Sequence, residues 1–152
     1  MAVDAADEIR QLKYRYFRTL DLKRWTEFAD CFVADATGDY AGLVFDDRDA
    51  LVAFMAENMG PGLISLHQAH HPEIAVDDDG ETATGVWYLE DKVIVPDAGF
   101  VLEGAAFYDD RYVRTPEGWR IQHTGYRRTY EMSWSTADVP SLTIKRGTAY
   151  AE

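Results

Sequence analysis

The sequence predicts an α+β fold, in which a curved, mostly antiparallel sheet wraps around helices from the N-terminal part of the chain. Apolar residues recur at helical spacing in that part, whereas alternating runs typical of strands begin at Ile64. Turn-forming sequences at 77–80, 96–99 and 115–118 divide these runs. Helices followed by an antiparallel meander are typical of α+β domains, so we expect a pocket between the two layers.

The first helix is predicted over residues 4–20. Asp4 can serve as its N-cap, and acidic side chains follow in the first turn, where the helix dipole favours them. An apolar stripe recurs along it at helical spacing, formed by Ile9, Leu12, Tyr16 and Leu20.

A second, short helix is predicted over residues 22–32. Its apolar stripe is formed by Trp25, Phe28, Ala29 and Phe32. The two helices would meet at a corner with Asp21 in the joint. An aspartate in that position either caps the second helix or turns inward, and the pattern leaves both alternatives open.

Extended segments at 37–40 and 43–45 are expected to form a hairpin. A third helix should then start at Asp46 or Asp47 and end at the sequence Gly60-Pro61-Gly62. Four strands are predicted over 65–76, 82–95, 100–114 and 118–132. We expect one domain over 1–152, whose C-terminal tail, 133–152, either extends onto a neighbouring subunit or is loose.

The composition excludes several classes of function. The 27 acidic and 15 basic residues give a net charge of −12, so the electrostatic field would repel nucleic acids and anionic membranes. No signal peptide or long apolar segment is recognisable, and the single cysteine, Cys31, cannot form an intrachain disulfide. These features predict a cytoplasmic protein. The sequence motifs of nucleotide, acyl-serine and thiol-redox enzymes are absent, which favours acid–base chemistry without a cofactor.

His67 is the candidate general base, because it lies near the start of a predicted strand whose alternate side chains face the concave side. A packing or surface histidine would fit the same pattern. His67, His70 and His71 could also suggest a metal site, but on a strand His70 points away from the other two. We therefore predict no metal.

Other side chains could complete an acid–base site. Tyr16 lies in the apolar stripe of the first helix, where a buried hydroxyl needs a polar partner, and Tyr40 on the hairpin could act similarly. Glu90 and Asp91 point to opposite faces of their strand, so one of them can face the pocket. Arg127 and Arg128 alternate in the same way, so one of them can bind a carboxylate or carbonyl oxygen.

The chain resembles the SnoaL-like enzymes of the nuclear-transport-factor-2-like superfamily, and among these most closely the bile-acid 7α-dehydratases. The resemblance is carried by several segments: Tyr16-Phe17-Arg18 with Leu20-Asp21, His67 with Pro72-Glu73-Ile74, Trp87-Tyr88-Leu89-Glu90-Asp91, Gly104-Ala105-Ala106-Phe107-Tyr108, and Thr124-Gly125-Tyr126 with Arg128. It implies a cone-shaped α+β barrel that works as a trimer without a cofactor.

The resemblance also implies roles for individual residues. The catalytic positions would be Tyr16, Asp21, His67 and Asp91. Substrate-binding positions would be Tyr40, Arg128, Trp87 and Tyr126. In this reading His67, oriented by Asp21 or Asp91, removes a proton from carbon while Tyr16 stabilises the developing enolate or the departing hydroxyl group.

The expected function is therefore that of a lyase that eliminates water, or a comparable group, from a hydrophobic cyclic or steroid-like substrate. Two alternatives stay open. The same groups could return the proton elsewhere, as in an isomerase or a polyketide cyclase. The chain could also be a non-catalytic ligand-binding protein or a partner resembling the small subunits of ring-hydroxylating oxygenases, although such proteins do not need these acid–base groups.

Overall fold

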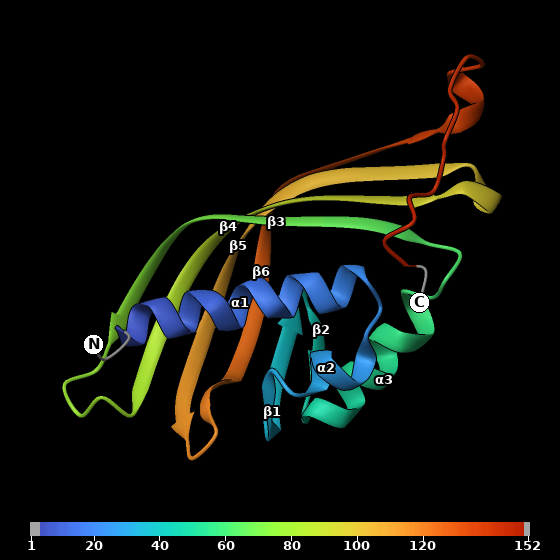
Figure 1. The fold of residues 1–152 in the computed structure, drawn as a ribbon. Coiled ribbons are helices and arrows are strands. Elements are labelled where there is room, and N and C mark those ends of the chain that lie inside the picture. Colours follow the sequence, from blue (N-terminus) through green and yellow to red (C-terminus); the bar gives the residue numbers. More distant parts are fainter. Residues whose placement is uncertain (1–3, 151–152) are drawn as a thin grey trace.

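A computed structural model describes residues 4–150, which form three α-helices and one six-stranded sheet (Figure 1). The helices are α1 (Ala5–Asp21), α2 (Trp25–Ala29) and α3 (Arg48–Asn58). The strands are β1 (Phe32–Tyr40), β2 (Leu43–Phe45), β3 (Ile64–Val76), β4 (Thr82–Val95), β5 (Phe100–Thr115) and β6 (Gly118–Ser135). Short 3₁₀ turns, η1 (Pro96–Ala98) and η2 (Thr136–Asp138), follow β4 and β6.

The sheet has the strand order β2-β1-β6-β5-β4-β3 and is antiparallel except where β1 pairs with β6. Strands β3 to β6 are long and strongly curved, and α1 crosses their concave side (Figure 1). Helix α3 covers β1 near one end of α1. The predicted α+β fold is confirmed, and its concave side is where a pocket can form.

Helix α1 forms as the sequence predicts. The Asp4 side chain accepts a hydrogen bond from the Ala6 backbone N–H at the N-terminus of the helix. All four members of the apolar stripe are buried: Ile9, Leu12, Tyr16 and Leu20. Lys23, just after the helix, has a φ of 59°, a left-handed conformation that turns the chain away from the helix axis.

The predicted helix over 22–32 is wrong in extent, because only Trp25–Ala29 is α-helical. Phe32 instead begins β1, yet it is 3 % exposed and packs against Phe28 with ring centroids 5.2 Å apart. The apolar stripe predicted burial correctly. It could not show that the last aromatic ring reaches the core from a strand rather than from a helix.

The first strand of the predicted hairpin is longer than expected, because β1 begins at Phe32 and not at position 37, whereas the remaining elements agree closely with their predicted bounds. The 43–45 segment pairs with β1 as a hairpin, and the Asp47 side chain caps α3 by accepting from Ala50 N–H at 2.8 Å. The last strand, β6, continues to Ser135, three residues beyond its predicted end at position 132. None of the helices within residues 4–150 has the length and apolar character needed to cross a membrane.

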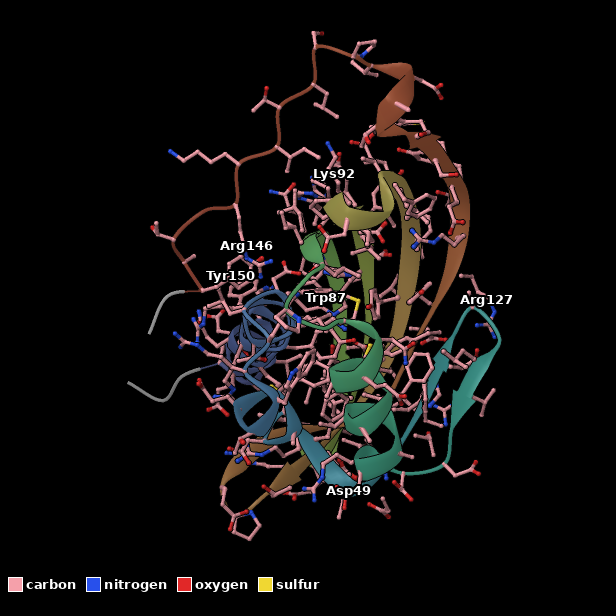
Figure 2. All side chains as sticks on the ribbon, turned by 90° about the vertical axis from the view of Figure 1, so that its right-hand side faces the viewer. Asp49, Trp87, Lys92, Arg127, Arg146 and Tyr150 are labelled. Carbon is pink, nitrogen blue, oxygen red and sulfur yellow. The ribbon has the colours of Figure 1, made fainter. Side chains whose placement is uncertain are left out.

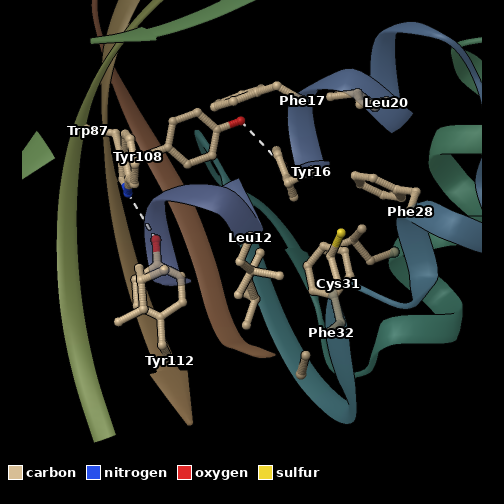
Figure 3. Close-up of a cluster of buried hydrophobic side chains, with 14 of the residues drawn as sticks. Leu12, Tyr16, Phe17, Leu20, Phe28, Cys31, Phe32, Trp87, Tyr108 and Tyr112 are labelled. Carbon is tan, nitrogen blue, oxygen red and sulfur yellow. Dashed lines mark hydrogen bonds between the residues drawn. The ribbon is translucent and has the colours of Figure 1, made fainter. Parts of the chain in front are cut away.

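The main core lies between α1, α2 and the concave face of the sheet (Figure 3). It is unusually aromatic; the labelled rings include Tyr16, Phe17, Phe28 and Phe32. One charged pair lies inside it: Lys13 Nζ is 2.7 Å from Asp110 Oδ2, and both side chains are completely buried.

The C-terminal segment after η2 returns toward the helices, as the positions of Arg146 and Tyr150 show (Figure 2). The Arg146 guanidinium donates to the Pro61 carbonyl oxygen and lies over the Tyr150 ring, 4.2 Å from its centroid. Lys23 Nζ lies 5.6 Å from the same centroid. Residues 136–150 of the predicted tail therefore make contacts within their own chain, while 151–152 lie outside the described residues.

Candidate active site

A cavity of about 120 Å³ lies between α1, α3 and the concave face of the sheet. Its lining combines apolar, phenolic and charged side chains: Tyr16, Leu20, Tyr40, Met55, Met59, His67, Asp91, Val93, Tyr108, Tyr126 and Arg128. Two parts of the lining are distinguished by their chemistry. The phenol wall consists of Tyr16, Tyr40 and Tyr108, and the charged wall consists of His67, Asp91 and Arg128.

Asp21, the last residue of α1, binds His67 through both carboxylate oxygens. The Asp21 Oδ1 atom is 2.7 Å from His67 Nδ1, and Oδ2 accepts from the His67 backbone N–H at 2.9 Å. Ser65 Oγ also donates to Oδ1, at 2.8 Å. These bonds attach the end of α1 to β3. Asp21 therefore turns inward, and α2, which begins after Arg24 without a side-chain cap, does not use it as an N-cap.

The contact with Asp21 determines the tautomer of His67. An ionised carboxylate only accepts hydrogen bonds, so Nδ1 of the neutral imidazole carries the proton and Nε2 has the free lone pair. The ring is stacked on Phe17, with centroids 5.9 Å apart and planes at 14°. The His67 side chain is only 10 % exposed. These contacts hold the imidazole in one orientation at the cavity surface.

The phenol wall is a chain of hydroxyl groups. Tyr16 Oη lies 2.6 Å from Tyr40 Oη and 3.3 Å from Tyr108 Oη. Burial, reinforced by the neighbouring phenols, raises the pKa of Tyr16 well above its ordinary value, and burial is also the largest cause of the raised pKa of Tyr40 and Tyr108. All three phenols are therefore protonated at neutral pH and can donate hydrogen bonds to a bound oxygen atom.

The remainder of the charged wall is an ion pair between β4 and β6. Arg128 binds Asp91 through two nearly parallel contacts, Nη1 to Oδ1 at 2.5 Å and Nη2 to Oδ2 at 2.9 Å. The Asp91 side chain is 4 % exposed. The hydrogen bond from Arg128 to Asp91 is the main cause of the raised pKa of Arg128. The pair presents a planar, fixed cation and anion to the cavity.

Gly104 on β5 makes this ion pair possible. It is aligned with Asp91 on one neighbouring strand, and Arg128 must pass over it to reach that carboxylate. A Cβ atom on Gly104 would lie 2.6 Å from Arg128 Nη1 and 2.8 Å from the Tyr130 carbonyl oxygen. Only glycine leaves room for the guanidinium in this position.

Six of the eight predicted site residues line the cavity: Tyr16, Tyr40, His67, Asp91, Tyr126 and Arg128. Asp21 lies behind His67 and acts through it. Trp87 does not line the cavity, so its prediction as a substrate-binding residue is not supported. It lies four residues from Asp91 on the same face of β4, but is completely buried and donates through Nε1 to Tyr112 Oη at 2.9 Å.

The structure also distinguishes between the pairs of charged residues that the sequence left open. Asp91 and Arg128 face the cavity, whereas Glu90 is exposed and Arg127 binds Asp39 outside it. Within residues 4–150, Asp21 is the carboxylate that contacts the imidazole of His67, whereas both oxygens of Asp91 contact Arg128.

The three histidines of β3 do not converge. His70 Nε2 is 3.9 Å from the exposed Glu90 carboxylate, far round the strand from the cavity lining. His71 has a φ of 47°, and the register of β3 against β4 shifts between His70 and Glu73. This irregularity is a bulge beside Pro72, and it changes the alternation of the side chains beyond His70.

Sequence reasoning missed several contributors to the site, including the apolar lining residues Leu20 and Val93. Tyr108 alternates with Asp110 and Tyr112 on the inward face of β5, a pattern that could have indicated a polar interior. Met55 on α3 and Met59, the residue directly after α3, recur at helical spacing, which could have indicated that this helix closes the cavity. Ser65 had no signal of its own, because its role depends on where Asp21 lies in three dimensions.

Comparisons with known proteins agree with the fold. The SnoaL-like domain model matches residues 1–125. An uncharacterised protein of Mycobacterium tuberculosis is 32% identical over 117 residues, which cover 75% of this chain and 78% of that protein. Another uncharacterised protein, from Mycobacterium bovis, matches equally well.

Several solved structures share the fold. A candidate scytalone dehydratase from Novosphingobium aromaticivorans aligns with a TM-score of 0.77 at 19% identity, over 84% of this chain and 85% of that one. The hexachlorocyclohexane dehydrochlorinase LinA-type3 from Novosphingobium barchaimii aligns with a TM-score of 0.77 at 12% identity, over 93% and 94%. At such identities the likeness concerns the fold alone. From the matched domain and the mycobacterial relatives, the chain belongs to the SnoaL-like domain family.

Proposed function

We propose that this protein is a dehydratase-like lyase that acts on a hydrophobic cyclic substrate through general base catalysis by His67. The observation that carries the proposal is the Asp21–His67 pair at the surface of a largely apolar cavity. An imidazole with Nδ1 bound to a carboxylate and Nε2 free is arranged to accept a proton. A purely ligand-binding protein has no need of this arrangement.

In the proposed reaction, His67 Nε2 takes a proton from the carbon next to a ketone. The electron pair of the C–H bond moves toward the carbonyl, whose oxygen gains negative charge and accepts a hydrogen bond from Tyr16. The C–O bond to the leaving hydroxyl group then breaks as the C=C bond forms. The imidazolium of His67 returns its proton to that hydroxyl group, so water leaves and the base is regenerated.

The volume of the cavity limits the size of the substrate that can bind without a movement of the lining residues. About 120 Å³ is below the ~300 Å³ at which pockets for drug-sized ligands begin. A bicyclic or steroid-like substrate of the kind handled by bile-acid 7α-dehydratases would require Met55 and Met59 to move. Both are half-buried, and methionine side chains adapt readily because they are unbranched. We propose that α3 therefore forms the adjustable side of the site.

The proposal extends to the assembly and environment of the enzyme. Family resemblance supports a single domain over 1–152 that works as a homotrimer without a cofactor. The lone, buried Cys31 is compatible with a reducing cytoplasm.

Product analysis tests the proposed reaction. The purified protein is incubated with 3-hydroxycyclohexanone and with a bicyclic β-hydroxy ketone, and the products are analysed by mass spectrometry. We expect loss of one water and a conjugated enone, with turnover abolished in His67→Ala. A product of unchanged mass would make the enzyme an isomerase or cyclase. Unchanged substrate, together with co-purification of a larger iron-containing chain, would favour the small-subunit alternative.

A further inference from the structure

A buried charged group that the proposed reaction does not use lies directly behind the phenol wall. Lys13 is one turn before Tyr16 on α1, and its side chain is completely buried. Its Nζ atom is 4.2 Å from the centroid of the Tyr16 ring and 3.8 Å from that of Tyr108. A buried lysine stays charged only when its environment compensates for the lost hydration, so this position requires an explanation.

Asp110 compensates for the charge, and it is itself fixed from the side of the sheet. Its Oδ2 atom is 2.7 Å from Lys13 Nζ and accepts from Tyr112 Oη, also at 2.7 Å. Its Oδ1 atom accepts from Thr124 Oγ1 at 2.7 Å. Trp87 donates to Tyr112 Oη and completes the network (Figure 3). The carboxylate end is thus held by two hydroxyl donors of the sheet.

The ammonium end is directed toward the phenols. Lys13 Nζ forms an ion pair with Asp110 Oδ2 at 2.7 Å. The ammonium also lies over the aromatic faces of Tyr16, Tyr108 and Phe17. The ion pair is a dipole whose positive end touches two members of the phenol wall.

We infer that Lys13 is a positioning residue, whose charge on the ring faces of Tyr16 and Tyr108 makes their hydroxyl groups stronger hydrogen-bond donors to an oxyanion in the cavity. A cation on the face of a phenol attracts electron density from the ring and favours negative charge on its oxygen. The same effect strengthens the O–H donor. Because the ammonium is buried, water does not screen this field.

This inference rests on the proposed function, because it assigns Lys13 to the stabilisation of the same oxyanion. It also specifies the class of ligand that the cavity should bind best, a flat ring that carries an anionic oxygen. A phenolate resembles the enolate of a cyclic ketone in shape and charge. The wild-type protein should therefore bind 4-nitrophenolate more tightly than the neutral, similarly shaped nitrobenzene.

The test uses the double variant Lys13→Met/Asp110→Asn. Replacing both charges leaves neither ion unpaired, and exchanging a buried ion pair for neutral residues is often tolerated. If this variant does not fold, the double variant Lys13→Gln/Asp110→Asn is used in its place, because its two amide side chains can contact each other. The same result is expected for it. The matched control is Arg10→Met/Asp7→Asn, which removes an exposed ion pair from the same helix.

We expect the double variant to bind 4-nitrophenolate roughly 10-fold more weakly, with nitrobenzene affinity unchanged, whereas the control variant keeps both affinities. A merely structural role would lower both affinities together. Equal binding of 4-nitrophenolate by the wild type and the folded double variant would overturn this inference and leave the proposed function intact. Failure of the wild type to prefer 4-nitrophenolate would contradict the oxyanion site itself and overturn both.

Discussion

The charged wall and the phenol wall of the cavity satisfy their polar groups in different ways. On the charged wall each ionic group has a dedicated partner, Asp21 for His67 and Arg128 for Asp91. On the phenol wall the hydroxyl groups bind mainly one another. The first arrangement fixes orientation and charge. The second can exchange one O–H···O bond for another at little cost, which suits a bound oxygen whose charge changes during a reaction.

We expect the largest effect, a loss of turnover, when a residue that binds the charged wall is replaced. Replacing Asp21 with Asn offers His67 an amide that can donate to Nδ1, which favours the tautomer with its proton on Nε2 and removes the free lone pair. We expect turnover to fall by about 10² to 10⁴-fold, measured as initial rates on a substrate identified by the product analysis. Ser65→Ala is the control, since it removes one bond to Asp21 but leaves the imidazole pair. A fall as large in Ser65→Ala would assign the loss to disturbed structure.

The ion pair of the charged wall should show the next largest effect, on stability. Arg128→Met leaves the Asp91 carboxylate buried without its cation, which should lower the free energy of unfolding by about 3–5 kcal/mol. Urea denaturation measures the difference. The double variant Arg128→Met/Asp91→Asn should recover most of it, and a double variant as unstable as the single one would show that packing, not the unpaired charge, is responsible.

The buried phenols of the phenol wall should make the free energy of unfolding depend on pH in the alkaline range. Burial raises the pKa of Tyr16, Tyr40 and Tyr108 above the ordinary value of 10.0, so these phenols stay protonated in the folded state after the unfolded chain has ionised. The unfolded state then binds fewer protons, and stability must fall as pH rises above 10. Each phenol contributes about 1.4 kcal/mol per pH unit. Denaturation between about pH 9 and 11 should give a shallower slope for Tyr16→Phe than for the wild type.

The smallest effect is expected from a single hydroxyl group of the phenol wall. Tyr40→Phe removes the 2.6 Å partner of Tyr16 and leaves Tyr108 at 3.3 Å. Stability should fall by about 0.5–1.5 kcal/mol, the usual net value of one hydrogen bond, as measured by thermal or urea denaturation. A loss above this range would mean that the phenols form a cooperative unit rather than exchangeable partners.

The sequence predicted most of the fold because local patterns determine it. Capping residues, helical stripes and turn sequences predict elements whose bounds lie within a few residues of those observed. The exceptions are α2, which is shorter than predicted, and β1, which begins five residues earlier than predicted, because Phe32 at helical spacing already belongs to the strand. Periodicity reports which face is buried, and it cannot report where one type of element changes to another.

The site was predictable to the extent that residue type and strand parity determine it. Residue type and periodicity predicted Tyr16 and His67, and they limited the charged positions to Glu90 or Asp91 and to Arg127 or Arg128; only the family resemblance indicated Asp91 and Arg128. Asp21 was expected as the partner of His67, but the pairing of Arg128 with Asp91 was not predicted, because it depends on contacts across the sheet: Arg128 reaches Asp91 over Gly104 on the strand between them. Lys13 was missed for a similar reason. Its partner Asp110 is distant in sequence, and a lone lysine in a helix ordinarily indicates a solvated position.

Hydrogen exchange at carbon tests most directly whether His67 removes a proton from a substrate. The wild-type protein and His67→Ala are incubated in deuterated buffer with 2-tetralone, a bicyclic ketone with acidic C–H bonds, and deuterium incorporation is followed by NMR. We expect the wild type to accelerate the exchange and His67→Ala to lose this acceleration while keeping its thermal midpoint. Exchange at the same rate with both proteins would contradict the role of His67 as the base.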